Sequence, residues 1–176
     1  MHILFICTGN ICRSPSAERL AASFCAENSI ADFRASSAGT RAVIGHPVHP
    51  DAARVLESLG GDPAGFAARQ LTAKIATDAD LVIAMTKAHR DAVLELAPRQ
   101  LHRTFTLTEA AELVSQFDPA DVKELATLRP RLRADQSPDV PDPIGQDQGV
   151  FENVGSQIAE LVRPVVEFCR RVSTGP

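Results

Sequence analysis

The chain has 176 residues, of which 44% are hydrophobic and 23% charged, and its formal net charge is −4 at pH 7. This length and apolar content suit one domain over residues 1–176, with a frayed tail at 172–176. The slight negative charge argues against a nucleic-acid partner. The absence of a long apolar run or a leader ahead of the first strand predicts no signal peptide and no membrane insertion, hence a cytoplasmic protein. The four cysteines fit neither a disulfide framework nor a metal site, so we expect reduced thiols, no metal and no cofactor.

Strands and helices alternate along the chain. We predict strands at 2–6, 33–38, 80–85 and 102–106, and helices at 15–29, 49–59, 87–97, 108–117 and 151–171. This alternation is typical of an α/β fold, in which right-handed crossovers build a parallel sheet with helices on both faces. Ligands of such sheets bind beyond the carboxyl ends of the strands. A functional site is therefore expected where a strand ends.

The end of the first predicted strand carries the strongest motif. The apolar run Ile3–Ile6 leads into Cys7, and Arg13 follows six residues later, just before Pro15, which we place at the first position of a helix. The intervening Thr8–Asn10 tolerates tight backbone curvature, and Gly9 would let the main chain approach a ligand closely. The backbone N–H groups of such a loop would point at a dianion.

Two side chains of this loop have the chemistry of a phosphate-transfer site. Arg13 would donate two parallel hydrogen bonds to phosphoryl oxygens, which a lysine does not match in geometry. The donors around the loop would also favour the thiolate of Cys7 and make it a nucleophile. The alternative is that Cys7 is only a small buried residue at a strand end.

The chain resembles a known family at four places. The loop Cys7-Thr8-Gly9-Asn10-Ile11-Cys12-Arg13-Ser14-Pro15, with Ala17-Glu18 after it, resembles the signature loop of the low-molecular-weight protein tyrosine phosphatases. Ser36–Thr40 is similar to the end of that family's second strand, Asp80–Thr86 to its third strand, and Asp142-Pro143 to its general-acid motif. The resemblance implies a single domain with a four-stranded parallel sheet in the order 2-1-3-4.

The resemblance also implies a two-step hydrolysis of a phosphomonoester. Cys7 would attack phosphorus and form a phosphocysteine, while Arg13 holds the phosphoryl oxygens and Asp142 protonates the leaving oxygen and then activates water. Ser14 would bond the Cys7 thiolate and Asn10 would brace the loop. The predicted ligand is inorganic phosphate, a similar oxyanion or a phosphoprotein. The predicted phosphate-binding residues are Thr8, Gly9, Asn10, Ile11, Cys12, Arg13 and Ser14.

More than one residue is a candidate for the general acid. Asp118-Pro119 is another Asp-Pro pair, and Asp139 lies close to Asp142 in the sequence. The predicted helix 108–117 leaves from the catalytic edge of the sheet, and ten helical residues rise about 15 Å. Asp118 would therefore lie away from that edge, whereas Asp142 directly precedes the last helix in a loop that has returned. We predict Asp142, with Asp139 and Asp118 as alternatives.

The substrate prediction depends on the walls of the pocket. Many family members have aromatic residues after the Asp-Pro, but Ile144-Gly145-Gln146 follow here, and the chain contains no Tyr or Trp. This apolar-Gly loop resembles the arginine-phosphate branch of the family, which typically has Thr where this chain has Ile11. An aliphatic side chain at Ile11 favours packing on an aromatic leaving group. We predict a protein phosphotyrosine substrate, such as a bacterial tyrosine kinase or its target.

Four other functions are considered. A phosphate-carrying cysteine domain of a sugar phosphotransferase system would explain a cysteine at a strand end, but it has no use for Arg13 or Asp142. A protein-arginine phosphatase is the main alternative. A thioredoxin-coupled arsenate reductase would need a downstream cysteine pair, which is missing between Cys25 and Cys169. A non-catalytic phosphate-binding module would not need both Cys7 and Asp142.

Several residues keep two interpretations at this stage. Cys12 is either a disulfide partner for oxidised Cys7 or a packing residue. The segment 118–141 is either a solvated loop with a short helical turn, or a docking surface or lid. His46, His49 and Arg41 are expected as surface loop residues beside the cleft, Glu18 as a helix-dipole or packing residue, and Cys25 and Cys169 as core.

Overall fold

The structure, a computed structural model, describes residues 1–28, 30, 32–133 and 137–173. Its elements in chain order are β1 (His2–Cys7), α1 (Arg13–Glu27), β2 (Arg34–Gly39), α2 (Pro50–Ser58), α3 (Ala73–Thr77), β3 (Leu81–Ala84), α4 (Lys87–Leu96), η1 (Pro98–Arg103), β4 (Thr104–Thr106), α5 (Leu107–Phe117), α6 (Val122–Leu128), η2 (Arg129–Arg131) and α7 (Gln148–Ser173). Across this described part of the chain, every helix is too short or too polar to span a bilayer.

The four strands form one parallel sheet in the order β2-β1-β3-β4, which confirms the predicted fold class and strand order. Strand β1 pairs on both sides, with Phe5 opposite Ser37 of β2 and Ile83 of β3. Cys7 ends β1 opposite Gly39, at the end of β2. The first strand therefore delivers Cys7 to the middle of the carboxyl edge of the sheet.

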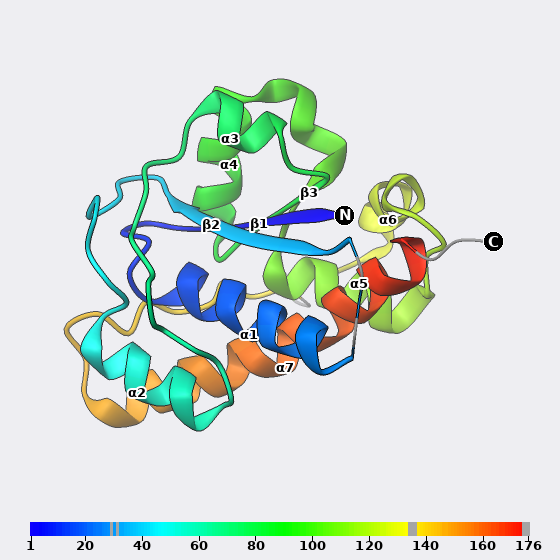
Figure 1. The fold of residues 1–176 in the computed structure, drawn as a ribbon. Coiled ribbons are helices and arrows are strands. Elements are labelled where there is room, and N and C mark those ends of the chain that lie inside the picture. The colour runs from blue at the N-terminus through cyan, green and yellow to red at the C-terminus, as the bar shows by residue number, and fades with distance from the viewer. Residues whose placement is uncertain (29, 31, 134–136, 174–176) are drawn as a thin grey trace.

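The side chains of β1 alternate between two apolar layers. Ile3, Phe5 and Cys7 pack with α1, α5 and α7 on one face, while Leu4 and Ile6 pack with α3 and α4 on the other. All of these strand residues are buried. Figure 1 shows the same arrangement, with α1, α5 and α7 below the sheet and α3 and α4 above it. A strand that is apolar on both faces is what a covered parallel sheet requires.

Some predicted boundaries are wrong by a few residues. Helix α1 begins at Arg13 rather than at Pro15, which occupies the third helical position, and α7 begins at Gln148 rather than at residue 151. Strand β4 begins at Thr104 because η1 fills the preceding residues. Of the expected frayed tail, residues 172 and 173 belong to α7, and residues 174–176 lie outside the described residues. Residue 29, at the end of the first predicted helix, also lies outside them.

The segment 118–141 is not simply a solvated loop. Helix α6 buries Leu125, and the guanidinium of Arg129 lies 4.2 Å from the centre of the Phe105 ring and donates to the carbonyl oxygen of Thr104 at 2.6 Å. The carboxylate of Glu109 lies 2.7 Å from Nε of Arg129. The segment thus packs against β4 and α5 through a cation–π contact and an ion pair. Residues 134–136 of this segment lie outside the described part.

Candidate active site

The loop between β1 and α1 curves because one residue adopts a left-handed conformation. Asn10 has φ 56° without being glycine. The carbonyl oxygens of Cys7, Thr8 and Gly9 accept hydrogen bonds from the backbone N–H groups of residues 40, 41 and 43, at 2.9, 3.0 and 2.9 Å. Because the C=O and N–H of a trans peptide point in opposite directions, the N–H groups joined to these carbonyls turn away from residues 40–43. A phosphate cradle requires N–H groups that are turned away from the surrounding backbone in this manner.

The close approach of this loop to β2 depends on Gly39. A Cβ on Gly39 would lie only 2.5 Å from the carbonyl oxygen of Thr8. By contrast, a Cβ on Gly9 would meet Ile11 and Val43 at ordinary contact distances, so the surrounding protein does not require glycine there. The tight protein contact thus lies at Gly39, while the role expected for Gly9, which concerns the approach of the main chain to a ligand, stays a prediction.

The thiol of Cys7 is held by a buried polar cluster. Its Sγ lies 2.9 Å from Oγ of Ser14. The Nδ2 of Asn10 donates to Oγ of Ser14 at 2.9 Å and to Oγ of Ser37 at 2.8 Å, while the backbone N–H of Arg69 donates to Oδ1 of Asn10 at 2.9 Å. These contacts fix the side chain of Asn10 and thereby the curve of the loop.

Arg13 joins the loop to the predicted acid. One guanidinium nitrogen donates to the carbonyl oxygen of Val140 at 3.0 Å, and another donates to Oδ2 of Asp142 at 2.8 Å. The Arg13 side chain is 5% exposed and that of Asp142 48% exposed. The carboxylate of Asp142 therefore lies half exposed at the mouth of the pocket, while the guanidinium of Arg13 is buried at the floor of the pocket.

The segment carrying Asp142 is anchored to the sheet. The backbone N–H of Val140 donates to the carbonyl oxygen of Met85 at 2.9 Å, directly after β3, and Val140 is fully buried. Oδ1 of Asp142 accepts from the backbone N–H of Ile144 at 3.2 Å, and Gly145 turns with φ 80°. The loop that was expected to return to the catalytic edge does so.

The two alternative acids have other contacts. Oδ1 of Asp139 accepts a hydrogen bond at 2.8 Å from the backbone N–H of Lys87, at the start of α4. Asp118 ends α5 and pairs with Arg171, near the end of α7. Neither carboxylate lines the pocket around Cys7.

The pocket over the loop has a volume of about 330 Å³. Its lining residues are Cys7, Thr8, Gly9, Ile11, Cys12, Arg13, Arg41, Val43, Asp142 and Ile144. Of the predicted site residues, only Asn10 and Ser14 are missing from this lining, because both lie behind the loop in the polar cluster. Val43 and Ile144 form an aliphatic mouth, and Ile44 beside them is 69% exposed.

One functional contact was missed in the sequence. His89 is buried on α4, and its Nε2 lies 2.8 Å from Oγ1 of Thr8 in the loop. Burial, and next the positive charge of Arg13, lowers the pKa of His89 from 6.5 to about 4, so the imidazole is neutral near pH 7. The two residues are 81 positions apart, and no local pattern connects them.

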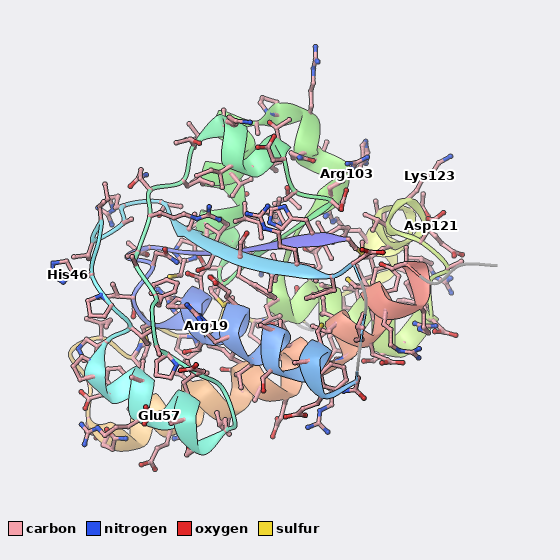
Figure 2. All side chains as sticks on the ribbon, viewed as in Figure 1. Arg19, His46, Glu57, Arg103, Asp121 and Lys123 are labelled. Carbon is pink, nitrogen blue, oxygen red and sulfur yellow. The ribbon has the colours of Figure 1, made fainter. Side chains whose placement is uncertain are left out.

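The other cysteines and loop histidines are placed as follows. Burial raises the pKa of Cys12 to about 12 and that of Cys25 to about 11, and it raises the pKa of Cys169 as well. His49 caps α2 and stacks on Phe151, with the ring centres 5.2 Å apart. His46 lies at the outer edge of its loop and points away from the body of the protein (Figure 2). Within the described residues, no cluster of His, Cys, Asp and Glu is suited to a metal ion.

The parallel α/β sheet and the curved loop that follows its first strand place this chain among the phosphatases. The family described as low molecular weight phosphotyrosine protein phosphatase matches residues 2–172. The chain belongs to this family, whose members are hydrolases.

Individual relatives are similar to this chain over almost its whole length. The low molecular weight protein-tyrosine-phosphatase Etp of Escherichia coli K12 is 30% identical over 171 residues, which cover 97% of this chain and 94% of that protein. The structure of a low molecular weight protein tyrosine phosphatase from T. tengcongensis is 28% identical, with a TM-score of 0.77 over 95% of this chain and 98% of that one. A mutant of the arginine phosphatase YwlE with a phosphorylated active-site serine is 26% identical, with a TM-score of 0.76 over 95% and 94% of the two chains.

Proposed function

We propose that this protein hydrolyses phosphotyrosine in proteins through a phosphocysteine on Cys7, with Arg13 as the phosphate clamp and Asp142 as the general acid and base. The observation that carries the proposal is the contact of Arg13 with Asp142 at 2.8 Å, in the pocket that Cys7 also lines. One guanidinium thus lies between the loop that would hold the phosphoryl group and the carboxyl group that would serve its leaving oxygen.

The chemistry follows in two balanced steps. The Cys7 thiolate forms an S–P bond as the bond from phosphorus to the leaving oxygen breaks, and Asp142 gives its proton to that oxygen. Asp142, now a carboxylate, then takes a proton from water as the water oxygen bonds phosphorus and the S–P bond breaks. Phosphate leaves and the thiolate returns. The phosphorylated serine of the YwlE mutant supports a covalent step at this kind of site.

The choice of tyrosine rests on the pocket mouth. Ile11, Val43 and Ile144 present aliphatic surface to the leaving group, and such surface packs on an aromatic ring better than it solvates a guanidinium. The likeness to YwlE keeps protein-arginine phosphatase as the second candidate, and the Ile144-Gly145 turn favours it. In either case, we propose a phosphoprotein in the cytoplasm as the substrate and inorganic phosphate as the product and loop ligand.

Phosphate release from two matched peptides decides between the substrates. One peptide carries phosphotyrosine and the other phosphoarginine, and Cys7→Ser serves as the blank. We expect preference for phosphotyrosine. Preference for phosphoarginine would keep the mechanism and reassign the substrate, while turnover by Cys7→Ser would remove Cys7 as the nucleophile.

Asp142 is tested with leaving groups of different quality. We expect Asp142→Ala to lose about 10²–10⁴-fold in kcat/KM, which reports the step that expels the leaving group, on phenyl phosphate, but far less on p-nitrophenyl phosphate, whose leaving group needs less protonation. Asp118→Ala is the matched control, since it removes the other Asp-Pro carboxylate, and it should retain activity on both. An equal loss on the two substrates in Asp142→Ala would assign the acid elsewhere.

A further inference from the structure

A chain of buried side chains continues from the Cys7 thiol to a carboxylate on α1. Glu18 lies five residues after Arg13, and its Oε2 is 2.6 Å from Oγ of Ser37. Ser37 is the serine of β2 that also contacts Asn10. Glu18 was expected as a helix-dipole or packing residue, but its carboxylate ends a chain of four hydrogen bonds that begins at the thiol of Cys7.

The directions of these hydrogen bonds are set from two sides, by a backbone N–H that donates to Asn10 and by a carboxylate that accepts from Ser37. The N–H of Arg69 can only donate, so the oxygen of the Asn10 amide must face it and the NH₂ group must face both serines. Oγ of Ser14 therefore accepts from Asn10, and its own proton is left to donate to Sγ of Cys7. Oγ of Ser37 likewise accepts from Asn10, and its proton is left to donate to Glu18.

Glu18 is suited to hold this direction. A carboxylate only accepts, so Ser37 cannot turn its proton toward the NH₂ of Asn10 while Glu18 is ionised. Burial raises the pKa of Glu18, while the bond from Ser37 and the charges of Arg19 and Arg69 act against that rise. Arg19 projects from the same helix (Figure 2). Hydrogen bonds in such a chain polarise one another in a medium of low dielectric.

We propose that Glu18 is a positioning residue, which acts through Ser37, Asn10 and Ser14 to keep the Ser14 hydroxyl donating to the Cys7 thiolate. The proposal rests on the proposed function only for the use of that thiolate. It adds a residue on the far side of the loop that touches neither the substrate nor the reacting atoms.

The direct readout is the alkylation of Cys7 by iodoacetamide as a function of pH, resolved by tandem mass spectrometry from the other cysteines. We expect Glu18→Ala to raise the pH of half-maximal reactivity by about half a unit to one unit, which lowers the rate below that pH by about three- to tenfold. Glu18→Gln keeps an acceptor oxygen, so its shift should be smaller. Glu27→Ala on the same helix, where Glu27 is exposed, is the matched control and should show no shift.

A double-mutant cycle tests the route. If Glu18 acts through Ser14, Glu18→Ala should change the alkylation rate less than about twofold in a Ser14→Ala background. A full shift in that background would overturn the proposal, as would an unchanged profile in Glu18→Ala alone. Should Glu18→Ala fail to fold, Ser37→Ala breaks the same link from its other end, and an unchanged profile there is equally decisive.

Alkylation requires no turnover, so this test is independent of the substrate assays. Turnover by Cys7→Ser would refute the proposed function and leave the alkylation result standing. Conversely, an additive cycle would refute the role of Glu18 and leave the phosphatase mechanism intact.

Discussion

The buried histidine beside the loop predicts a specific loss of stability in mild acid. His89 is 6% exposed, and its pKa is lowered from 6.5 to about 4. In the unfolded chain it would take up a proton as the pH falls through 6.5, whereas in the folded protein it would not do so until about pH 4. The unfolded state thus binds more protons in this window, and stability must fall as the pH falls.

The size of the effect follows from the two values. At about 1.4 kcal/mol for each pH unit between 6.5 and about 4, the contribution of His89 to the free energy of unfolding is on the order of 3 kcal/mol. This contribution is fully present above pH 6.5 and lost by about pH 4. Burial is the main cause and the charge of Arg13 the next, while Asp142 and Asp139 oppose them.

Urea unfolding at pH 7.0, 5.5 and 4.5 measures this contribution when the parent is compared with His89→Gln. Gln can still donate to Thr8 but does not titrate. The free energy of unfolding of the parent should fall relative to that of His89→Gln as the pH falls, because only the parent loses the His89 contribution, while the remaining titratable groups are the same in both. Parallel pH profiles, or a His89 resonance that titrates near pH 6.5 by NMR, would refute the reasoning.

Two further predictions concern the loop. Gly39→Ala places a Cβ 2.5 Å from the carbonyl oxygen of Thr8, so the loop must shift. We expect kcat/KM to fall by about tenfold or more. An unchanged kcat/KM would show that the loop accommodates the Cβ without harm. Under peroxide, Cys12→Ser should lose activity irreversibly, while the parent recovers with a thiol reductant. The negative charge of Cys7 is one cause of the raised pKa of Cys12, and oxidation of Cys7 would remove that charge. Equal recovery of the two proteins would show that Cys12 is only a packing residue.

The part of the site that could be predicted from the sequence is the part encoded locally. The loop from Cys7 to Arg13 follows a buried strand within a few residues, so strand, turn and helix start are read from adjacent positions. Asp142 required an argument about chain direction, and its contact with Arg13 agrees with that argument. The strand order came from the family resemblance, since alternation alone does not order strands.

The features that could not be predicted from the sequence are short helices and contacts between residues that lie far apart in the chain. Helices α3 and α6 have five and seven residues, too few for an apolar period to stand out. The contacts of Thr8 with His89 and of Glu18 with Ser37 join residues 81 and 19 positions apart, and only the folded chain brings them together. The steric need for glycine at Gly39 was also missed, because the carbonyl oxygen of Thr8 that crowds it belongs to another segment of the chain.

The mouth and the base of the pocket differ in how they are attached to the fold. The base is fixed by buried side chains and by backbone bonds to two neighbouring segments, while Val43, Ile44 and Ile144 stand exposed on surface loops. Substitutions at the mouth would therefore change which phosphorylated side chain enters, with little effect on folding or on the reaction itself. In such an architecture, the surface that a ligand meets at the rim can change without any change in the buried loop beneath it.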